Sequence, residues 1–246
     1  MIEELLPDSV VTVEAHGDDH VWGAPLYPGE QQLVARSVEK RRREFAAVRA
    51  CARRAMEKLG VPAQPVLRGE HGAPVWPAGL IGSMTHCEGY CAASLARATD
   101  LASLGIDAEP HEELPPDVIT AVALSTEQDR VRELAARNPS VHWDRLLFSA
   151  KESVYKAWFP LTGEWLDFLE ADIEIFADGG PAPRNSEARG AEADGTVRSG
   201  RFRAALLVPG PLVGGRRIES FDGRWTVRRD LVATAVTVPH AGAGKA

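Results

Sequence analysis

The sequence is short of cysteines, of positive charge and of long apolar runs. Three cysteines in 246 residues cannot build a disulfide framework and are typical of reduced thiols in a cytosolic protein. The net charge of -7 argues against non-specific binding to nucleic acid or to an anionic membrane. No apolar run approaches membrane-spanning length, and the acidic residues Glu3 and Glu4 do not fit a signal peptide. We therefore expect a soluble, cytoplasmic protein, monomeric and without nucleic-acid or membrane partners.

What is present is an ordinary globular composition, 44% hydrophobic and 26% charged, which can bury one large core or two smaller ones. Apolar periodicity predicts helices over residues 31–59, 125–137 and 142–158, the second capped by Ser125. Strands are expected over residues 10–13, 64–68, 80–85, 90–98, 101–109, 171–176, 201–208, 224–227 and 231–238. Pro110 and the Pro115-Pro116 pair indicate a connection between two halves. Residues 178–200 are expected to form a mobile loop and residues 240–246 to fray.

The helix expected over residues 142–158 presents a polar pair opposite its apolar stripe. The stripe recurs at spacings of three and four and consists of Trp143, Leu147, Ala150, Val154, Ala157 and Trp158. Glu152 lies almost opposite this stripe, and Lys156 follows one turn later on the same side. An exposed Glu–Lys pair of this spacing is common on solvated helices and stabilises them by roughly a few tenths of a kcal/mol. A functional role therefore depends on further acidic residues nearby.

Two arginines lie on the apolar side of the helix expected over residues 31–59. The stripe there consists of Val38, Phe45, Val48, Ala52, Ala55, Met56 and Leu59. Arg41 and Arg49 stand four residues either side of Phe45, on or beside this stripe. Because burial of an unpaired charge is costly, both require an anionic partner. A structural carboxylate and a ligand phosphate are equally compatible with the pattern.

Two carboxylates end the strand expected over residues 101–109. Asp107 and Glu109 are two residues apart and share one face of the strand, whereas Ile106 and Ala108 point to the other face. Like charges this close stay ionised only with a cation or strong donors between them. With a third carboxylate from a helix they would form an oxygen site of the kind that holds Mg²⁺. The alternative is an exposed acidic strand end.

Residues 82–87 read Gly-Ser-Met-Thr-His-Cys and place His86 at the end of a strand. A lone histidine is more often a structural hydrogen-bonding group than a catalyst. Zinc binding by His86, Cys87 and Cys91 is disfavoured, because the spacing lacks a Cys-x-x-Cys pair and a fourth ligand. Small buried thiols explain the two cysteines better.

Two separated motifs together resemble a known signature. Residues 105–109 read Gly-Ile-Asp-Ala-Glu, and residues 148–157 read Phe-Ser-Ala-Lys-Glu-Ser-Val-Tyr-Lys-Ala. This pair resembles the signature of the Sfp-type 4'-phosphopantetheinyl transferases. Residues 40–42, 72–77 and 82–87 resemble the actinobacterial, enterobactin-synthase-like branch of that family. The resemblance spans residues 38–168, resumes in the last strands and assigns no role to residues 178–200.

The resemblance implies an α/β (α+β) fold of two similar halves in a pseudo-twofold arrangement, with the active site in the cleft between them. Residues 1–105 would bind the nucleotide end of coenzyme A, and residues 106–246 would carry Mg²⁺ and the catalytic groups. The implied metal ligands are Asp107, Glu109 and Glu152, and the implied catalytic residues are Glu152, Lys156 and His86. The implied contacts to coenzyme A are Arg41, Arg49, Arg68, His71, Met84, Thr85, His86, Lys151 and Lys156.

The phosphates of coenzyme A would then be the anions that Arg41 and Arg49 require. Relatives often have a lysine where this chain has His71, so that contact to the nucleotide is expected to be weaker or dependent on pH.

The implied reaction moves 4'-phosphopantetheine from coenzyme A to a serine of an apo acyl or peptidyl carrier protein and releases 3',5'-ADP. Such modification activates polyketide, nonribosomal peptide or fatty acid synthases. Mg²⁺, Lys156 and His86 would neutralise charge on the phosphates, and Glu152 would accept the serine proton directly or through water. The alternative is another Mg²⁺-dependent enzyme, such as a nucleotide diphosphate hydrolase. A nucleic-acid-binding module resting on residues 40–43 is disfavoured by the acidic net charge.

Overall fold

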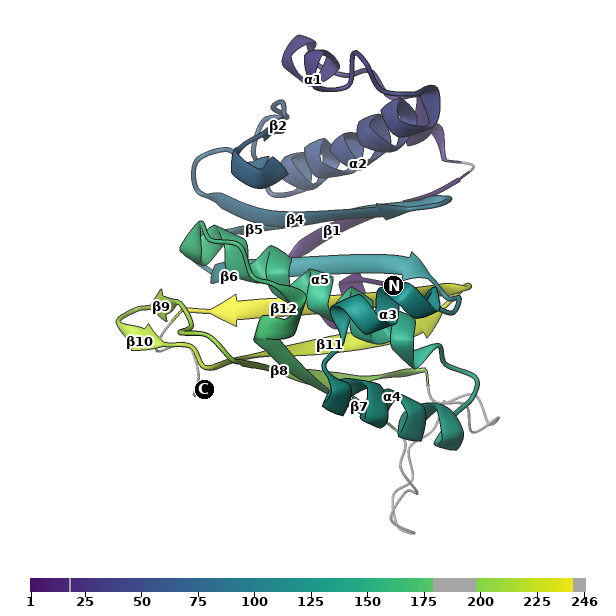
Figure 1. Cartoon of the computed structure of the whole chain (residues 1–246). Coiled ribbons are helices and arrows are strands. Elements are labelled where there is room, and N and C mark those ends of the chain that lie inside the picture. The colour runs from purple at the N-terminus through teal and green to yellow at the C-terminus, as the bar shows by residue number, and fades with distance from the viewer. Residues whose placement is uncertain (18, 179–197, 241–246) are drawn as a thin grey trace, which may run out of the picture.

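Two larger antiparallel sheets dominate the described part of the chain, and each has a helix of 20 residues packed on one face (Figure 1). The computed structural model describes residues 1–17, 19–178 and 198–240. In the first sheet the strand order is β1-β5-β4, formed by Val11–His16, Tyr90–Arg97 and Leu80–Cys87. Helix α2, Glu39–Lys58, covers one face of this sheet.

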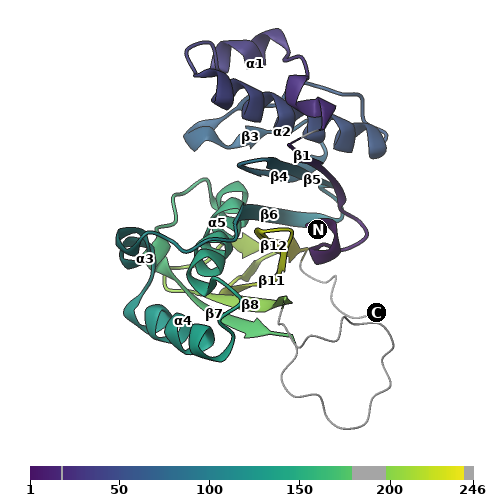
Figure 2. The same ribbon diagram turned by 90° about the vertical axis from the view of Figure 1, so that its right-hand side faces the viewer.

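The second sheet has the order β6-β12-β11-β8-β7. Its strands are Leu101–Pro110, Leu231–Pro239, Ser220–Arg228, Ser199–Leu206 and Ala171–Ala177. Helices α3, α4 and α5 lie together on one side of it (Figure 2), and they span Pro116–Val122, Ser125–Arg137 and Trp143–Thr162. All pairings within both sheets are antiparallel. Because helices pack on both sheets, the mixed helix-and-sheet fold predicted from the sequence is confirmed.

Shorter elements connect these layers. They are the helix α1 (Pro28–Leu33), the strands β2 (Leu67–Arg68), β3 (Pro74–Val75), β9 (Leu212–Val213) and β10 (Arg216–Arg217), and the 3-10 turns η1 (Glu3–Leu5), η2 (His20–Gly23), η3 (Glu70–Gly72) and η4 (Phe168–Glu170). Among the described residues, no helix is both long enough and apolar enough to cross a membrane.

The two sheets meet where β4 lies beside β6. Side-chain hydroxyls contribute to this junction: the Ile106 amide donates to Ser83 Oγ at 3.0 Å, and the Ala108 amide donates to Thr85 Oγ1 at 3.1 Å. Both hydroxyls belong to β4 and both amides to β6, so the junction brings the end of β4 against the acidic end of β6.

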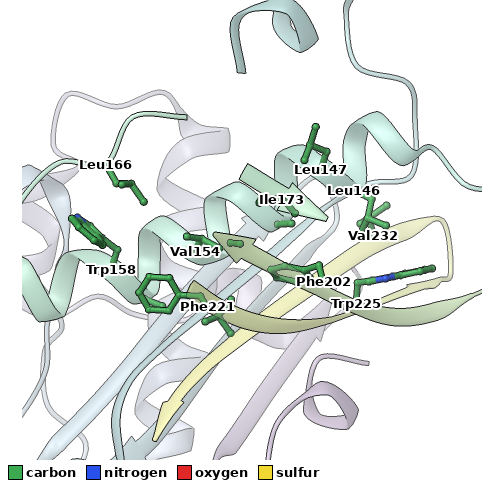
Figure 3. Close-up of a cluster of buried hydrophobic side chains, with 14 of the residues drawn as sticks. Leu146, Leu147, Val154, Trp158, Leu166, Ile173, Phe202, Phe221, Trp225 and Val232 are labelled. Atoms are coloured by element: carbon green, nitrogen blue, oxygen red, sulfur yellow. The ribbon is translucent and has the colours of Figure 1, made fainter. Parts of the chain in front are cut away.

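The largest buried cluster lies between α5 and the second sheet (Figure 3). All six residues of the stripe predicted for α5 are buried in it. Figure 3 shows Trp158 of α5 on the side of Phe221 and Val154 of α5 nearer Phe202 of the sheet. Burial of large apolar side chains stabilises by about 1.5–3 kcal/mol each, and this packing fixes which face of α5 is free to carry functional groups.

Gly105 allows α5 to approach β6 closely. A Cβ atom added at Gly105 would lie 2.0 Å from the Ser153 carbonyl oxygen and 2.7 Å from the Ala157 amide nitrogen. No side chain fits into that space. The first glycine of the Gly-Ile-Asp-Ala-Glu motif therefore sets the distance between the helix that carries Glu152 and the strand that carries Asp107.

Three local predictions need correction. The helix predicted over residues 31–59 is two helices, α1 and α2, because Val34 leaves helical geometry and Arg42 donates to the Val34 and Ala35 carbonyls at the end of α1. Val38 is not on the apolar stripe: it precedes α2 in an extended conformation and is 73% exposed. The N-cap of α4 is Leu124 rather than Ser125, and the Glu127 carboxylate accepts from the Leu124 amide.

Two predicted boundaries also differ from the structure. Of the strand predicted over residues 64–68, only β2 forms, and β8 already begins inside the loop predicted over residues 178–200. Residues 179–197 of that loop and residues 241–246 lie outside the described residues. Residue 105, where the sequence analysis divides the two halves, lies within β6.

Candidate active site

A cavity of about 380 Å³ opens beside the junction of the two sheets. It receives basic residues from α2, β2, β4 and α5 and aromatic residues from α2 and α5. Its lining includes Arg41, Phe45, Arg49, Arg68, His71, Trp76, Met84, Thr85, His86, Tyr155, Lys156 and Phe159. A cavity lined by several cations and few acids is suited to an anionic ligand.

Arg49 and Arg68 flank the ring of Phe45 in this cavity. The Arg49 guanidinium carbon lies 3.2 Å from the ring centroid and that of Arg68 lies 5.5 Å from it, within the range of cation–π attraction. Arg49 is only 4% exposed and donates to the Val66 carbonyl at 2.9 Å. Burial lowers the pKa of Arg49 to about 9, so it remains charged at neutral pH. Within the described part of the chain neither arginine forms a salt bridge, which leaves two cations for a ligand.

Arg41 extends from α2 to His86 at the end of β4. Its guanidinium contacts His86 Nε2, and the Glu44 carboxylate lies 3.8 Å from each of the two groups. Burial first, and then the charge of Arg41, lower the pKa of His86 to about 4. His86 is therefore neutral at pH 7 and can accept a hydrogen bond from Arg41.

Asp107 is the central carboxylate of the acidic cluster. It is 3% exposed, and its Oδ1 accepts from Lys156 Nζ at 2.7 Å and from Thr85 Oγ1 at 3.2 Å. Its other oxygen, Oδ2, is buried without a hydrogen-bond partner. Burial acts to lower the pKa of Lys156, but Asp107 and Glu152 outweigh it and raise that pKa. Lys156 is thus a firmly charged ammonium between the basic cavity and the carboxylates.

The other two carboxylates predicted to bind metal, those of Glu109 and Glu152, both have raised pKa values. Glu109 accepts from Arg145 at 3.2 Å, yet burial and the neighbouring charge of Asp107 raise the pKa of Glu109 to about 7. Burial likewise raises the pKa of Glu152, with Lys156 opposing it and Asp107 adding to it. Asp107 is therefore close enough to both Glu109 and Glu152 to raise their pKa values by its charge.

The chemistry of these oxygen donors suits a hard divalent cation. Oδ2 of Asp107 is buried and accepts from no donor among the described residues, and the pKa values of Glu109 and Glu152 are raised, first by burial and further by the charge of Asp107. A bound Mg²⁺, which prefers carboxylate oxygens, would offset the repulsion between these acids. Within the described residues, the acids do not already converge as a group of three around one metal position, because Lys156 and Arg145 hold two of them.

The ammonium of Lys151 is paired within the protein. It is buried, pairs with Glu127 at 2.9 Å and donates to the carbonyls of Phe168 and Ala171 at 2.6 and 2.8 Å. An ammonium has three donors, and these three acceptors use them. Lys151 therefore anchors η4 and β7 to α5, and it lines a second cavity beside the basic one.

A second, smaller cavity of about 240 Å³ adjoins the basic one and shares His71 and Tyr155 with it. Its lining includes the charged residues Lys151, Glu152 and Asp167 and the apolar residues Val154, Leu166 and Phe168. His71 has a positive φ of 49° and packs against Phe159 and Trp165 at ring-centroid distances of 5.7 and 6.5 Å. His71 thus lies between the basic cavity and a cavity of mixed polar and apolar lining.

Sequence reasoning missed three contributors to this site. Phe45 was assigned to the core, although its ring carries two arginines. Tyr155 lines both cavities. Arg145, the partner of Glu109, stands seven residues before Glu152, a spacing of two helical turns that places both on one face. That spacing was a usable signal for Arg145, whereas nothing in the sequence distinguished Phe45 from its apolar neighbours.

A cationic cavity close to a cluster of carboxylates suits a phosphorylated ligand that binds together with a cation. Comparison with known proteins gives the family. The model of the 4'-phosphopantetheinyl transferase N-terminal domain matches residues 29–96, and that of the 4'-phosphopantetheinyl transferase superfamily matches residues 103–206.

Whole-chain relatives agree with the family models. The chain is 51% identical to the 4'-phosphopantetheinyl transferase Svp of Streptomyces mobaraensis over 97% of this chain and 89% of Svp. It is 45% identical to the 4'-phosphopantetheinyl transferase PptT of Mycobacterium tuberculosis over 97% and 98% of the two chains. Enterobactin synthase component D of Salmonella typhi is 35% identical over 48% of this chain and 49% of its own.

The chain belongs to the 4'-phosphopantetheinyl transferase family. It transfers 4'-phosphopantetheine from coenzyme A to carrier proteins, and the function predicted from the two motifs is confirmed. The hydrolase alternative finds no support in these comparisons.

Proposed function

We propose that the basic cavity binds the nucleotide and diphosphate of coenzyme A and that the carboxylates beside it hold Mg²⁺ for the transfer. The observation that carries this proposal is the placement of Lys156. Its ammonium lines the basic cavity and also bonds Asp107. One residue therefore joins the space that fits phosphates to the acids that fit a cation.

We assign the basic residues of the cavity to two different phosphate groups of coenzyme A. Arg49 and Arg68 lack a carboxylate partner among the described residues and flank the Phe45 ring, so we assign them to the 3'-phosphate. Arg41, His86 and Lys156 lie on the side nearer Asp107 and are assigned to the diphosphate. Met84 and His71 also line this cavity. The second cavity, with its mixed polar and apolar lining, accommodates the flexible phosphopantetheine arm, because it shares Tyr155 with the basic cavity.

Asp107, Glu109 and Glu152 would hold the metal, which supplies charge neutralisation at the phosphates when bound. Lys156 adds a fixed positive charge on the same side. Glu152 has a raised pKa and lines the second cavity, so it is placed to take the proton of an incoming serine. The serine oxygen forms a bond to the β-phosphorus of coenzyme A, the bond to the 3',5'-ADP oxygen breaks, and the serine proton passes to Glu152 or to water. No redox partner is involved.

Mass spectrometry of an apo carrier protein tests this assignment. The unaltered chain with coenzyme A and Mg²⁺ is expected to add one phosphopantetheine to the carrier and to release one 3',5'-ADP per modified carrier. Release of 3',5'-ADP without a carrier would indicate hydrolysis instead. A Lys156→Met variant, which loses the ammonium but keeps much of the side-chain volume, is expected to lose turnover by about 10²-fold or more. Wild-type turnover in that variant would contradict the site.

A further inference from the structure

The hydroxyl of Thr85 is shared between two consecutive residues of β6. Thr85 lies near the end of β4 and is 4% exposed. Its Oγ1 accepts from the Ala108 amide at 3.1 Å and donates to Asp107 Oδ1 at 3.2 Å. The direction of both bonds follows from chemistry, because an amide can only donate and an ionised carboxylate can only accept.

This arrangement makes the two oxygens of Asp107 unequal. Oδ1 receives the Thr85 hydroxyl and the Lys156 ammonium, while Oδ2 is buried and has no partner. Two donors converging on one oxygen fix the rotation of the carboxylate, since turning it would break both bonds. The free oxygen is thus held in one position before any ligand arrives.

We propose that Thr85 is a positioning residue for Asp107, one that reserves Oδ2 for the catalytic cation. The proposal rests on the metal site of the proposed function and adds which oxygen binds and what orients it. It also changes the role that the sequence predicted for Thr85, which was contact with coenzyme A. The single proton of the hydroxyl is used within the protein, so it cannot be donated to a phosphate.

Ser83 provides a matched comparison in the same strand. It stands two residues before Thr85, is 3% exposed, and accepts from the Ile106 amide at 3.0 Å. Each hydroxyl therefore contributes one bond between β4 and β6, but only that of Thr85 also reaches a carboxylate. Removing Ser83 Oγ removes one hydrogen bond between β4 and β6. Removing Thr85 Oγ1 removes one such bond and also the hydrogen bond to Asp107.

The experiment measures Mn²⁺ affinity of the intact protein by electron paramagnetic resonance, without coenzyme A. Loss of a group that orients a metal ligand typically weakens metal binding about 10–100-fold. We expect a loss of this size in Thr85→Val, and Thr85→Ser and Ser83→Ala are expected to stay within about threefold of the unaltered chain. If Thr85→Val does not fold, Thr85→Ala carries the same comparison, because the smaller side chain lets water reach the Ala108 amide.

Amide hydrogen exchange supplies a second readout that needs no metal. Thr85→Val is expected to reduce protection at Ala108 and Ser83→Ala at Ile106, which establishes that each variant removes the intended bond. Unchanged Mn²⁺ affinity in Thr85→Val with lost Ala108 protection would overturn the positioning role. An equal loss of affinity in Ser83→Ala would overturn it too, since the strand junction alone would then explain the effect. Absence of Mn²⁺ binding in the unaltered chain would instead contradict the metal site of the proposed function.

Discussion

At the scale of the residue, the site is built from charges that the fold leaves incompletely paired. Among the described residues, Arg49 is buried against Phe45 and donates to a backbone carbonyl alone. Asp107 keeps one oxygen to which no described residue donates, and Glu109 has its pKa raised to about 7. Leaving such groups unsatisfied costs free energy, and a substrate that brings phosphates together with a cation recovers that cost.

Replacing Arg49 with alanine should weaken coenzyme A binding much more than dephospho-coenzyme A binding. The second ligand lacks the 3'-phosphate that we assign to Arg49, and a charge-assisted contact of this kind contributes about 1.5–3 kcal/mol. Calorimetry with both ligands measures the difference, and Arg54→Ala, on the same helix outside the cavity, serves as control. Equal losses for the two ligands would place Arg49 elsewhere on coenzyme A or give it a structural role only.

The protonation of His86 should depend on Arg41. Because burial and Arg41 lower its pKa to about 4 from the ordinary 6.5, the unfolded chain binds more protons than the folded one between these values. The free energy of unfolding should therefore rise with pH across this window, and the contribution of His86 is lost as pH falls from about 6.5 to about 4. NMR titration of the ligand-free protein should show a neutral ring at pH 6, and Arg41→Met should raise the midpoint. A midpoint near 6.5 with Arg41 present would refute the arrangement.

The residue types of the site were largely predictable, but their pairings were not. Helical periodicity alone indicated that Arg41 and Arg49 needed an anion and that Glu152 and Lys156 faced away from the core. Periodicity does not show, however, which residues from distant parts of the chain come into contact. That Lys151 bonds Glu127 depends on how α4 and η4 pack on α5, and this packing is set by residues distant in the chain.

At the scale of the element, α5 and β6 form the framework of the acidic cluster. Successive turns of α5 present Arg145, Glu152 and Lys156 on one side while its stripe is buried on the other. The strand β6 presents Asp107 toward Lys156. The stripe and the strand were both predictable from their periods of 3.6 and 2. The hydroxyl bonds between β4 and β6 were not, since no local pattern specifies which strands of two separate sheets become neighbours.

The close contact between α5 and β6 should not tolerate a side chain at Gly105. In Gly105→Ala the new methyl group would collide with backbone atoms of Ser153 and Ala157, which cannot yield as a side chain can. Overpacking costs about 1–3 kcal/mol in well-packed cores, and we expect the upper end of that range or more, together with loss of transferase activity.

Chemical denaturation of Gly105→Ala beside Gly23→Ala measures this effect. A Cβ atom at Gly23 meets nothing within 4 Å, so that variant should stay within about 0.5 kcal/mol of the unaltered chain. A Gly105→Ala protein as stable and active as the unaltered chain would show that α5 can move away from β6 without consequence.

At the scale of the whole molecule, the active site lies where two helix-covered sheets meet. The N-terminal residues Ile2, Leu5 and Leu6 are buried in a cluster with Leu104 of β6 and apolar residues of β5 and β12, so the junction has its own core. The arginines of the basic cavity come from α2 and β2, and the acids from β6 and α5. Joining the two sheets therefore brings together the basic residues that we propose for phosphate binding and the acids that we propose for cation binding.

The central claim is that Asp107 holds the cation on which phosphopantetheine transfer depends. The most direct test is the rate of carrier modification, followed by mass spectrometry across a Mg²⁺ titration, for Asp107→Ala and for Asp117→Ala, an exposed acid in the first turn of α3. Circular dichroism of the same samples reports folding. We predict a folded Asp107→Ala protein that adds no phosphopantetheine at any Mg²⁺ concentration, beside an Asp117→Ala protein that behaves as the unaltered chain. Wild-type turnover of Asp107→Ala at limiting Mg²⁺ would contradict the claim.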